Sequence, residues 1–338
     1  MNQRIPVAVL GCTGMVGQKF ITLLENHPWF ELKELVASER SAGKTYRERG
    51  CWKQPTPIPE HIANTRIQSP QEPLQSRILF SGLDANIAGE LEEQYAQRGH
   101  LVVSNARNHR MRLDVPLIIP EINGSQIQLL RKQTTYQHNG GGIVTNPNCS
   151  TIILALALYP IWQQFGLRRV MATTLQAISG AGYPGIPTLD LLGNTLPYIA
   201  GEEEKMESEI YKILGTNNFK ISTTCNRVPV LDGHSICISL QTQQPSTLEG
   251  LMHALEHSYA DLNLPSSPAQ VLQILTDPYH PQPRMDLQAG HGMTVSVGRL
   301  RTCPILDWKF TILGHNTIRG AAGAALLNAE WMTSNGLV

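Results

Sequence analysis

The first 150 positions alternate between short, continuously apolar segments and segments whose apolar residues recur at helical spacing. Continuous apolar runs of this kind predict buried strands. The predicted strands are Ile5–Leu10, 32–37, Ile78–Ser81 and Leu101–Ser104, with 115–119 and 140–144 completing the alternation. Helices are predicted over 18–25 and 88–97, and the Pro-, Gln- and Arg-rich residues 45–75 predict an irregular excursion. Strands that alternate with helices predict an α/β fold with a doubly wound, mostly parallel sheet.

Beyond residue 150 the pattern changes to strands with one buried face. Apolar and polar residues alternate over 170–178 and 234–241. Val230-Leu231 followed by Asp-Gly predicts a further strand that ends in a turn. Other strands are predicted over 293–300 and 308–313, helices over 201–214, 248–259 and 318–332, and loop over most of 265–283. We therefore expect an α+β second domain with a mixed, largely antiparallel sheet.

A length of 338 residues suits two domains, and 41% hydrophobic against 16% charged residues is enough for large cores. We place the first domain at 1–150 and the second, which we expect to carry catalysis and dimerisation, at 151–315. The last helix, within 316–338, is rich in Gly and Ala and can pack closely. We expect it to return to the first domain.

Charge and cysteine content exclude several classes of function. The net formal charge is zero without a basic run, which argues against nucleic-acid and membrane-surface partners. No apolar segment has membrane-spanning length and the start lacks a signal-type core, so we expect a cytoplasmic protein. Six cysteines without a CxxC motif fit free thiols in a reducing compartment. The 11 histidines show no zinc-ligand spacing, and no metal site is expected.

The first strand runs directly into a glycine-rich turn, Gly11-Cys12-Thr13-Gly14-Met15-Val16-Gly17, and then into a helix. Such a turn lets the backbone approach a dinucleotide while the helix N-terminus faces its pyrophosphate, which is typical of a Rossmann-like domain. The spacing is GxxGxxG rather than the commoner GxGxxG, and an ordinary glycine-rich turn is the alternative. The candidate cofactor contacts here are Gly11, Thr13, Gly14, Met15 and Val16.

The turn after the second strand bears on which nicotinamide cofactor binds. Glu39 is the acid that an NAD-binding domain would place against the ribose hydroxyls. Hydroxyl and cationic side chains surround it, however, and these suit a 2′-phosphate. They are Ser38, Arg40, Ser41 and Lys44. We favour NADP over NAD, and a solvated surface loop is the alternative.

The segment Thr145-Asn146-Pro147-Asn148-Cys149-Ser150-Thr151 precedes an apolar helical run. Asn-Pro breaks any preceding element, and Ser150 and Thr151 can cap the helix that follows. Cys149 then lies at a helix N-terminus, where free N–H groups and the helix dipole favour a thiolate. It is a candidate covalent nucleophile, and a small buried structural cysteine is the alternative.

Three further features are candidates for the same site. His234 follows Asp-Gly and, paired with a reactive cysteine, is a candidate acid/base; a structural histidine is the alternative. Gln176 ends a predicted strand, where it either contacts a ligand or makes a hydrogen bond on the sheet face. The loop 179–185 is rich in glycine and can approach a ligand closely. The acid-rich helix that begins near 201 is, taken alone, a solvated face.

Together these residues resemble the aspartate-semialdehyde dehydrogenases, in the branch found in archaea and fungi. The resemblance covers nearly the whole chain. Its most specific parts are 11–18, 146–151, 176–182, 201–205, 227–234 and 316–323. Ala200 departs from the pattern, since proline is expected before Gly201.

The resemblance implies a role for each matching residue. Cys149 is the nucleophile, His234 the acid/base, and Gln176 the residue that orients the acyl intermediate. The substrate is bound by Arg227, Glu202 and Lys205, and phosphate by Arg110, with Arg107 a weaker candidate in the same loop. The remaining cofactor contacts are Ser179, Gly180, Gly182 and Asn316.

The implied reaction is NADPH-dependent reductive dephosphorylation of 4-phospho-L-aspartate to L-aspartate 4-semialdehyde through a cysteine thioester. It belongs to the biosynthesis of lysine, threonine, methionine and isoleucine, and the family forms dimers or tetramers. Two alternatives stay open. One is malonyl-CoA reductase, a relative that shares the nucleophile and NADPH. The other is a catalytically silent NADP-binding protein, against which the joint presence of Cys149, Gln176 and His234 argues.

Overall fold

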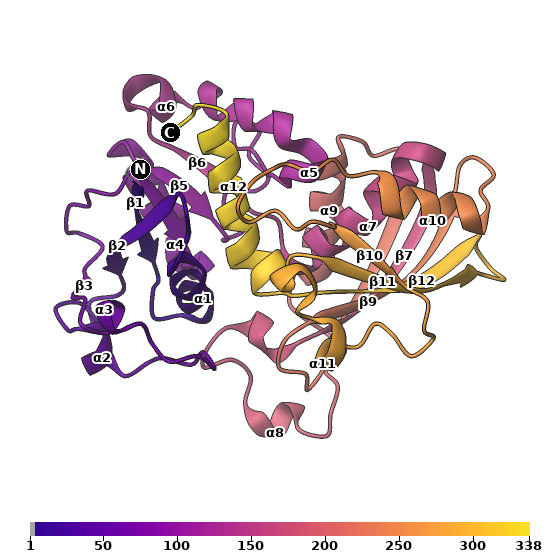
Figure 1. The fold of residues 1–338 in the computed structure, drawn as a ribbon, viewed down its shortest axis with the longest axis horizontal. Coiled ribbons are helices and arrows are strands. Elements are labelled where there is room, and N and C mark those ends of the chain that lie inside the picture. The colour runs from indigo at the N-terminus through magenta and orange to yellow at the C-terminus, as the bar shows by residue number, and fades with distance from the viewer. Residues whose placement is uncertain (1–3) are drawn as a thin grey trace.

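The computed structural model describes residues 4–338, which form two six-stranded sheets with helices around them (Figure 1). In the first sheet the strand order is β3-β2-β1-β4-β5-β6, and every pair of neighbours is parallel. Its strands are β1 (Ile5–Leu10), β2 (Phe30–Val36), β3 (Ile67–Gln68), β4 (Ile78–Ser81), β5 (Leu101–Ser104) and β6 (Gly142–Thr145). The predicted doubly wound parallel sheet is confirmed, and β1, β4 and β5 have the predicted bounds.

The carboxyl ends of these strands lie at one edge of the sheet. Leu10 of β1 pairs with Val36 of β2 and with Ser81 of β4, and Ser104 of β5 pairs with Thr145 of β6. The segments that follow these strands therefore leave the sheet side by side. They are the turns at 11–17 and 38–44 and the loops at 105–110 and 146–149. Doubly wound sheets bind their ligands at this edge.

Helices cover both faces of the first sheet. Val7 and Val9 pack with α1 (Met15–Leu24) and α12 (Gly323–Ser334) on one face. Ala8 and Leu10 pack with α4 (Ala85–Gln97) on the other. The C-terminal helix thus completes the core of a sheet made by the N-terminal residues (Figure 1). The smaller helices of this half are α2 (Tyr46–Arg49), α3 (Glu60–Ala63), α5 (Pro120–Asn123), the 3₁₀ helix Gly124–Lys132 and α6 (Thr134–Asn139).

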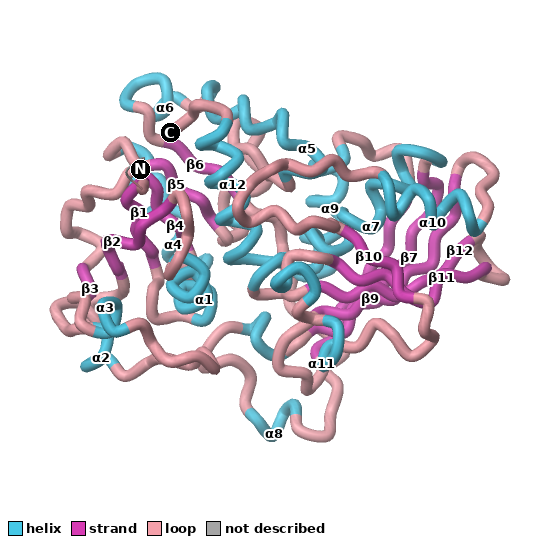
Figure 2. Tube along the Cα trace, in the orientation of Figure 1, coloured by secondary structure: helices cyan, strands magenta, loops and turns pink. Residues whose placement is uncertain are grey.

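The second sheet has the strand order β10-β11-β12-β9-β7-β8. Its strands are β7 (Leu167–Gln176), β8 (Lys220–Arg227), β9 (His234–Thr242), β10 (Leu272–Leu275), β11 (Val295–Thr302) and β12 (Trp308–Gly314). The three central pairs are antiparallel, whereas β10 with β11 and β7 with β8 are parallel. The expected mixed, largely antiparallel sheet is confirmed. Figure 2 shows the two groups of strands at opposite ends of the molecule, with helices between them.

One face of the second sheet packs against α7 (Cys149–Phe165), α9 (Glu202–Leu214) and α10 (Leu248–His257). Along the other face of β7 and β8 no helix of residues 4–338 covers the strands, because the side chains there are exposed. Along β7, Val170 and Ala172 are buried, whereas Arg169 and Met171 are exposed. This alternation is what the sequence pattern predicts for a strand with one buried face.

Helix α7 lies between the two sheets. Its residues 152–158 are all buried, and they are apolar on every side of the helix. Over residues 4–338, no helix combines the length and apolar character that crossing a membrane requires. The apolar character of α7 follows from its place inside the largest core cluster.

Five details of the structure differ from the sequence prediction. Val230-Leu231 is not a strand, because its carbonyl groups accept hydrogen bonds from the turn at 178–179. β8, which carries polar residues on both faces, was not predicted, and β10 lies within the predicted loop at 265–283. Residues 115–119 form only an isolated bridge, from Leu117 to Thr145. The last helix opens with a π-helical turn, Ile318–Ala322, before α12 begins.

Candidate active site

A cleft of about 1040 Å³ lies at the carboxyl edge of the first sheet and is also lined by residues of the second half. Most of the predicted site residues line it. They are Gly11, Thr13, Gly14, Met15, Val16, Ser38, Arg110, Cys149, Gln176, Ser179, Gly180, Gly182, Glu202, Lys205, Arg227 and Asn316. Arg107, the weaker phosphate candidate, also lines the cleft. The fold therefore brings together residues that are widely separated in the sequence.

The glycine turn is shaped for close approach by a ligand. Gly11 has φ +72°, and a Cβ there would lie 2.8 Å from the carbonyl oxygen of Gly82, so only glycine fits. A Cβ on Gly14 would meet protein atoms only at 3.4 Å or more. Gly14 is also the N-cap of α1 and has no side chain to occupy the first-turn N–H groups. These N–H groups border the cleft and can receive a pyrophosphate.

The turn 38–44 is only partly at the cleft. Ser38 lines it, whereas Arg40 and Lys44 are exposed residues outside its lining. Ser41 is buried, and its Oγ accepts a hydrogen bond of 2.9 Å from Nε of Arg49. The structure thus places one of the four predicted 2′-phosphate ligands at the cleft wall.

Helix α7 begins at Cys149, and Asn148 is its N-cap. The Asn148 Oδ1 accepts hydrogen bonds from the N–H groups of Ser150 at 2.9 Å and Thr151 at 3.1 Å. The prediction that Ser150 and Thr151 cap the helix is therefore wrong, because they supply the N–H groups that are capped. The prediction that Cys149 lies at a helix N-terminus is confirmed.

Cys149 is paired with His234. Its Sγ lies 3.2 Å from Nε2 of His234, and Nδ1 of the same ring accepts a hydrogen bond of 3.0 Å from the N–H of Ala177. Burial and the Glu202 carboxylate raise the pKa of Cys149 to about 12. Burial and the Arg227 guanidinium lower the pKa of His234 to about 3. The ligand-free pair is therefore uncharged, contrary to the expectation that the helix N-terminus makes a thiolate.

Glu202 is the first residue of α9 and joins several side chains of the site. Its Oε1 accepts hydrogen bonds from Nδ2 of Asn148 at 2.8 Å and from Nε2 of Gln176 at 3.2 Å. Its Oε2 accepts from Nζ of Lys205 at 2.5 Å. Burial opposes its ionisation, but Lys205 and the hydrogen bonds outweigh burial and lower the pKa of Glu202. The start of α9 is thus solvated only in part, because Glu202 is buried in the site whereas Glu204 is exposed.

The two arginines are also buried and lie on different elements. Arg227 ends β8, and its Nη1 donates to the carbonyl oxygen of Ala177 at 2.7 Å. Arg110 lies in the loop after β5; its Nη2 donates to the carbonyl oxygen of Asn105 at 2.6 Å, and its Nη1 pairs with Glu209 at 2.9 Å. Burial lowers the pKa of Arg227.

Sequence reasoning missed Asn148 and Glu209 as parts of the site. Glu209 is only 2% exposed and lies seven positions after Glu202 on α9. Seven residues are close to two helical turns, so this spacing puts both carboxylates on one face of the helix. That spacing was the available signal for Glu209. The signal for Asn148 was its position as an Asn directly before the first helical residue.

Asn316 ties two loops of the site together. Its Oδ1 accepts a hydrogen bond of 2.8 Å from the N–H of Gly233, and its Nδ2 donates to Oγ of Ser179 at 2.8 Å. Gly233 precedes His234, and Ser179 begins the glycine-rich loop at the cleft. Asn316 therefore holds this loop near His234.

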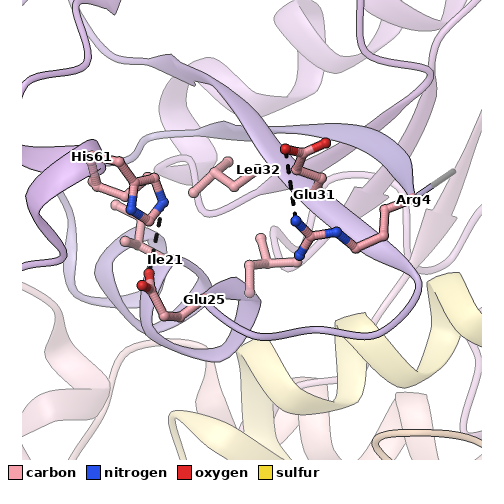
Figure 3. Close-up of a pocket in the computed structure, with 8 residues that line it drawn as sticks. Arg4, Ile21, Glu25, Glu31, Leu32 and His61 are labelled. Atoms are coloured by element: carbon pink, nitrogen blue, oxygen red, sulfur yellow. Dashed lines mark ion pairs between the residues drawn. The ribbon is translucent and has the colours of Figure 1, made fainter. Parts of the chain in front are cut away.

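A smaller pocket of about 210 Å³ lies away from this cleft (Figure 3). Leu32 and other apolar side chains contribute to its lining, and two ion pairs, Arg4 with Glu31 and His61 with Glu25, each span 3.8 Å there. None of the predicted site residues lines it. Within residues 4–338 no group of three or more His, Cys, Asp or Glu side chains is arranged to hold a metal ion.

Comparison with known proteins agrees with this geometry. Residues 6–130 match the family profile described as semialdehyde dehydrogenase, NAD binding domain. Residues 158–319 match the profile described as semialdehyde dehydrogenase, dimerisation domain. The aspartate-semialdehyde dehydrogenase of Archaeoglobus fulgidus is 45% identical over 345 residues, covering 99% of this chain and 100% of that protein. The enzyme of the same name from Saccharomyces cerevisiae is 43% identical, covering 98% of each.

Solved structures give the same result. The aspartate-semialdehyde dehydrogenase of Candida albicans, solved with NADP, superposes with a TM-score of 0.90 at 40% identity and covers 99% of this chain and 100% of that one. The aspartate-semialdehyde dehydrogenase II of Vibrio cholerae, solved as a complex with ASA, has a TM-score of 0.81 at 27% identity and covers 99% of both chains. The chain therefore belongs to the semialdehyde dehydrogenase family, among the aspartate-semialdehyde dehydrogenases.

Proposed function

We propose that the enzyme interconverts L-aspartate 4-semialdehyde, NADP⁺ and phosphate with 4-phospho-L-aspartate and NADPH. In the cell the reaction runs toward the semialdehyde, in the biosynthesis of lysine, threonine, methionine and isoleucine. The observation that carries the proposal is that Cys149, paired at 3.2 Å with the buried His234, lines one cleft with a glycine turn and two buried arginines. The names of the relatives support the substrate, and the NADP in the Candida albicans structure supports the cofactor.

The residues at the first sheet fit NADP. Gly11 and Gly14 leave room at the N-terminus of α1 for a pyrophosphate, and Ser38 lies where the ribose end would reach. The exposed Arg40 and Lys44 lie on the same turn, and we propose that they favour a 2′-phosphate. NADP, when bound, supplies the hydride acceptor, or as NADPH the donor.

In the proposed mechanism the Cys149 thiol releases its proton to solvent in the open cleft, and the resulting thiolate attacks the aldehyde carbon, which forms a carbon–sulfur bond and places negative charge on the aldehyde oxygen. Because Nδ1 of His234 accepts from Ala177, the neutral ring carries its proton on Nε2. Nε2–H therefore donates first to the sulfur and then to the developing oxyanion, as an acid. After oxidation leaves a thioester, attack by phosphate forms the acyl phosphate and breaks the carbon–sulfur bond. The thiolate of Cys149 leaves.

Each charged group of the substrate is matched to a side chain of complementary charge in the cleft. Arg227 offers a two-pronged donor for the α-carboxylate, and Glu202 accepts from the α-ammonium group. Arg110 and Lys205 are left for phosphate, and Gln176 orients the acyl group. Malonyl-CoA has no amine, so it would leave the carboxylate of Glu202 facing the substrate's own negative charge. This favours the amino-acid substrate over malonyl-CoA.

We also propose a homodimer, or a tetramer built from such dimers, with the helix-free face of the second sheet as its interface. The name of the profile matched by residues 158–319 supports this assembly. We also propose the division into domains at 1–150 and 151–315, with 316–338 joining the first; the two separate sheets and the packing of α12 in the core of the first sheet support it. The location proposed is the cytoplasm, with all six cysteines as free thiols.

The test is a spectrophotometric assay of NADPH formation with L-aspartate 4-semialdehyde, NADP⁺ and phosphate. We expect phosphate-dependent turnover, loss of turnover in Cys149→Ser with NADPH binding nearly intact, and normal turnover in the control Cys225→Ser. Glu202→Ala should raise KM for the semialdehyde selectively. If the enzyme reduced malonyl-CoA but did not turn over the semialdehyde, malonyl-CoA reductase would be the better assignment. If it bound NADPH but turned over neither compound, a catalytically silent NADP-binding protein would be the better assignment.

A further inference from the structure

Glu209 is a buried carboxylate to which neither the sequence nor the mechanism above gives a role. It lies on α9 and is 2% exposed. Its Oε1 accepts from Nη1 of Arg110 at 2.9 Å, and its Oε2 accepts from the backbone N–H of Asn148 at 2.7 Å. Both oxygens are therefore engaged, one by a cation and one by the residue directly before the nucleophile.

The two partners of Glu209 come from different parts of the site. Arg110 lies in the loop after β5 of the first sheet, and Asn148 caps the helix that begins at Cys149. The side chain of Asn148 donates in turn to Glu202, on the same face of α9. Helix α9 thus holds Asn148 through two carboxylates, and one of these also holds Arg110. A single side chain, that of Glu209, therefore links the Arg110 guanidinium to the residue directly before Cys149.

A carboxylate is required for this arrangement. An ion pair alone is a weak reason to bury two charges, because a well-packed apolar pair is often as stable. An apolar residue, however, would leave both the Arg110 Nη1 and the Asn148 N–H without an acceptor. Glutamine keeps the shape but has one acceptor oxygen, so it satisfies only one of the two donors.

We propose that Glu209 is a positioning residue that couples the phosphate subsite to the nucleophile. It fixes the Arg110 guanidinium so that phosphate meets the thioester on Cys149 at the correct distance and direction. The inference rests on the proposed function, in which Arg110 binds phosphate. It adds that the deacylation step depends on a residue that contacts neither substrate nor cofactor.

The experiment compares Glu209→Gln with Glu204→Gln, a matched control at an exposed acid of the same helix. Steady-state assays give KM for phosphate, for NADP⁺ and for the semialdehyde. A single turnover without phosphate measures formation of the thioester alone. Loss of a charge-assisted hydrogen bond predicts that KM for phosphate rises about 10- to 100-fold in Glu209→Gln. KM for NADP⁺ and the single-turnover rate should change less than about threefold in Glu209→Gln, because in the proposed site neither NADP⁺ nor the semialdehyde is bound by Arg110.

A double-mutant cycle with Arg110→Gln tests whether Glu209 acts through Arg110. If it does, adding Glu209→Gln to Arg110→Gln raises KM for phosphate little further, since coupled residues are not additive. A folded Glu209→Gln with normal KM for phosphate, beside an Arg110→Gln that is impaired, overturns this inference and leaves the proposed function standing. Normal phosphate kinetics in both variants overturns the role of Arg110 and this inference with it. Equal losses in single turnover and phosphate kinetics assign Glu209 a merely structural role and also overturn it.

Discussion

Gly320 lies against Cys149, the proposed nucleophile, and its replacement by alanine should displace that residue. A Cβ at position 320 would lie 2.7 Å from the Cβ of Cys149 and 3.1 Å from its Cα. Carbon atoms in contact prefer about 3.5–4.0 Å, so the two backbones must separate by about 1 Å. Gly320 is buried in the π-helical turn and Cys149 is in the first turn of α7, so neither can move alone. A misplacement of about 1 Å costs about 100-fold in rate, which is the fall in kcat expected for Gly320→Ala.

Gly323→Ala is the matched control. A Cβ there would lie 2.6 Å from Sδ of Met293, 2.8 Å from Cγ2 of Ile318 and 3.1 Å from the Ile318 carbonyl oxygen, and no atom of Cys149 is among these nearest neighbours. Both variants should lose about 1–3 kcal/mol of unfolding free energy through overpacking, but only Gly320→Ala should lose kcat. Initial rates of NADPH formation at saturating substrates and thermal unfolding measure the two effects. A folded Gly320→Ala with kcat near that of the parent, or an equal loss of kcat in the control, would refute the reasoning.

Three further predictions concern Cys149, the turn at 38–44 and the buried Glu92. The pKa of Cys149 is raised to about 12, so its thiol should stay protonated at neutral pH. In the ligand-free enzyme the rate of alkylation of Cys149 by iodoacetamide should therefore still rise about tenfold per pH unit beyond pH 9. An alkylation rate that already levels off below about pH 8 would instead mean that Cys149 is a thiolate at neutral pH. Arg40→Ala with Lys44→Ala should raise KM for NADPH about tenfold without affecting NADH, measured by steady-state rates; equal use of NADH by the parent would instead point to Glu39. Burial raises the pKa of Glu92 from 4.5 to about 7. The protonated carboxyl group is therefore favoured in the folded state, and its contribution to the free energy of unfolding is complete below pH 4.5 and is lost as the pH rises through 7. The difference in unfolding free energy between Glu92→Gln and the parent, measured by chemical denaturation, should therefore shift in favour of Glu92→Gln by up to about 3 kcal/mol between pH 4.5 and 7. A difference that does not change with pH would contradict this prediction.

The strands of the first sheet were predicted well because each one is marked by the apolar character of its own residues. β4 and β5 are buried on both faces, so each is a continuous apolar run with clear ends. β8 was missed because its buried face includes Thr223 and Arg227, whose polarity hides the alternation. Its place is decided by pairing with β7 and by contact with α9, neither of which is encoded in adjacent residues.

The candidate site shows the same division. The glycine turn and the segment around Cys149 carry their signals in neighbouring residues, and both were found. The anchors of the site act over long separations, since Glu209 lies 61 positions from Asn148 and 99 from Arg110. One sequence without its fold does not reveal such pairs. The pKa of Cys149 was mispredicted for a related reason, because helix-end electrostatics were visible in the sequence and burial was not.

The buried charges also explain which group is left for the substrate. Glu202 pairs with the half-buried Lys205, and Glu209 pairs with Arg110, which offsets the cost of burying Glu202, Glu209 and Arg110. Arg227 differs, because among residues 4–338 no carboxylate lies within ion-pair distance of it and its Nε has no hydrogen-bond partner. A buried cation without a counter-ion is destabilising until an anion arrives. We propose that the α-carboxylate of the substrate is this anion and that its binding neutralises the charge of Arg227.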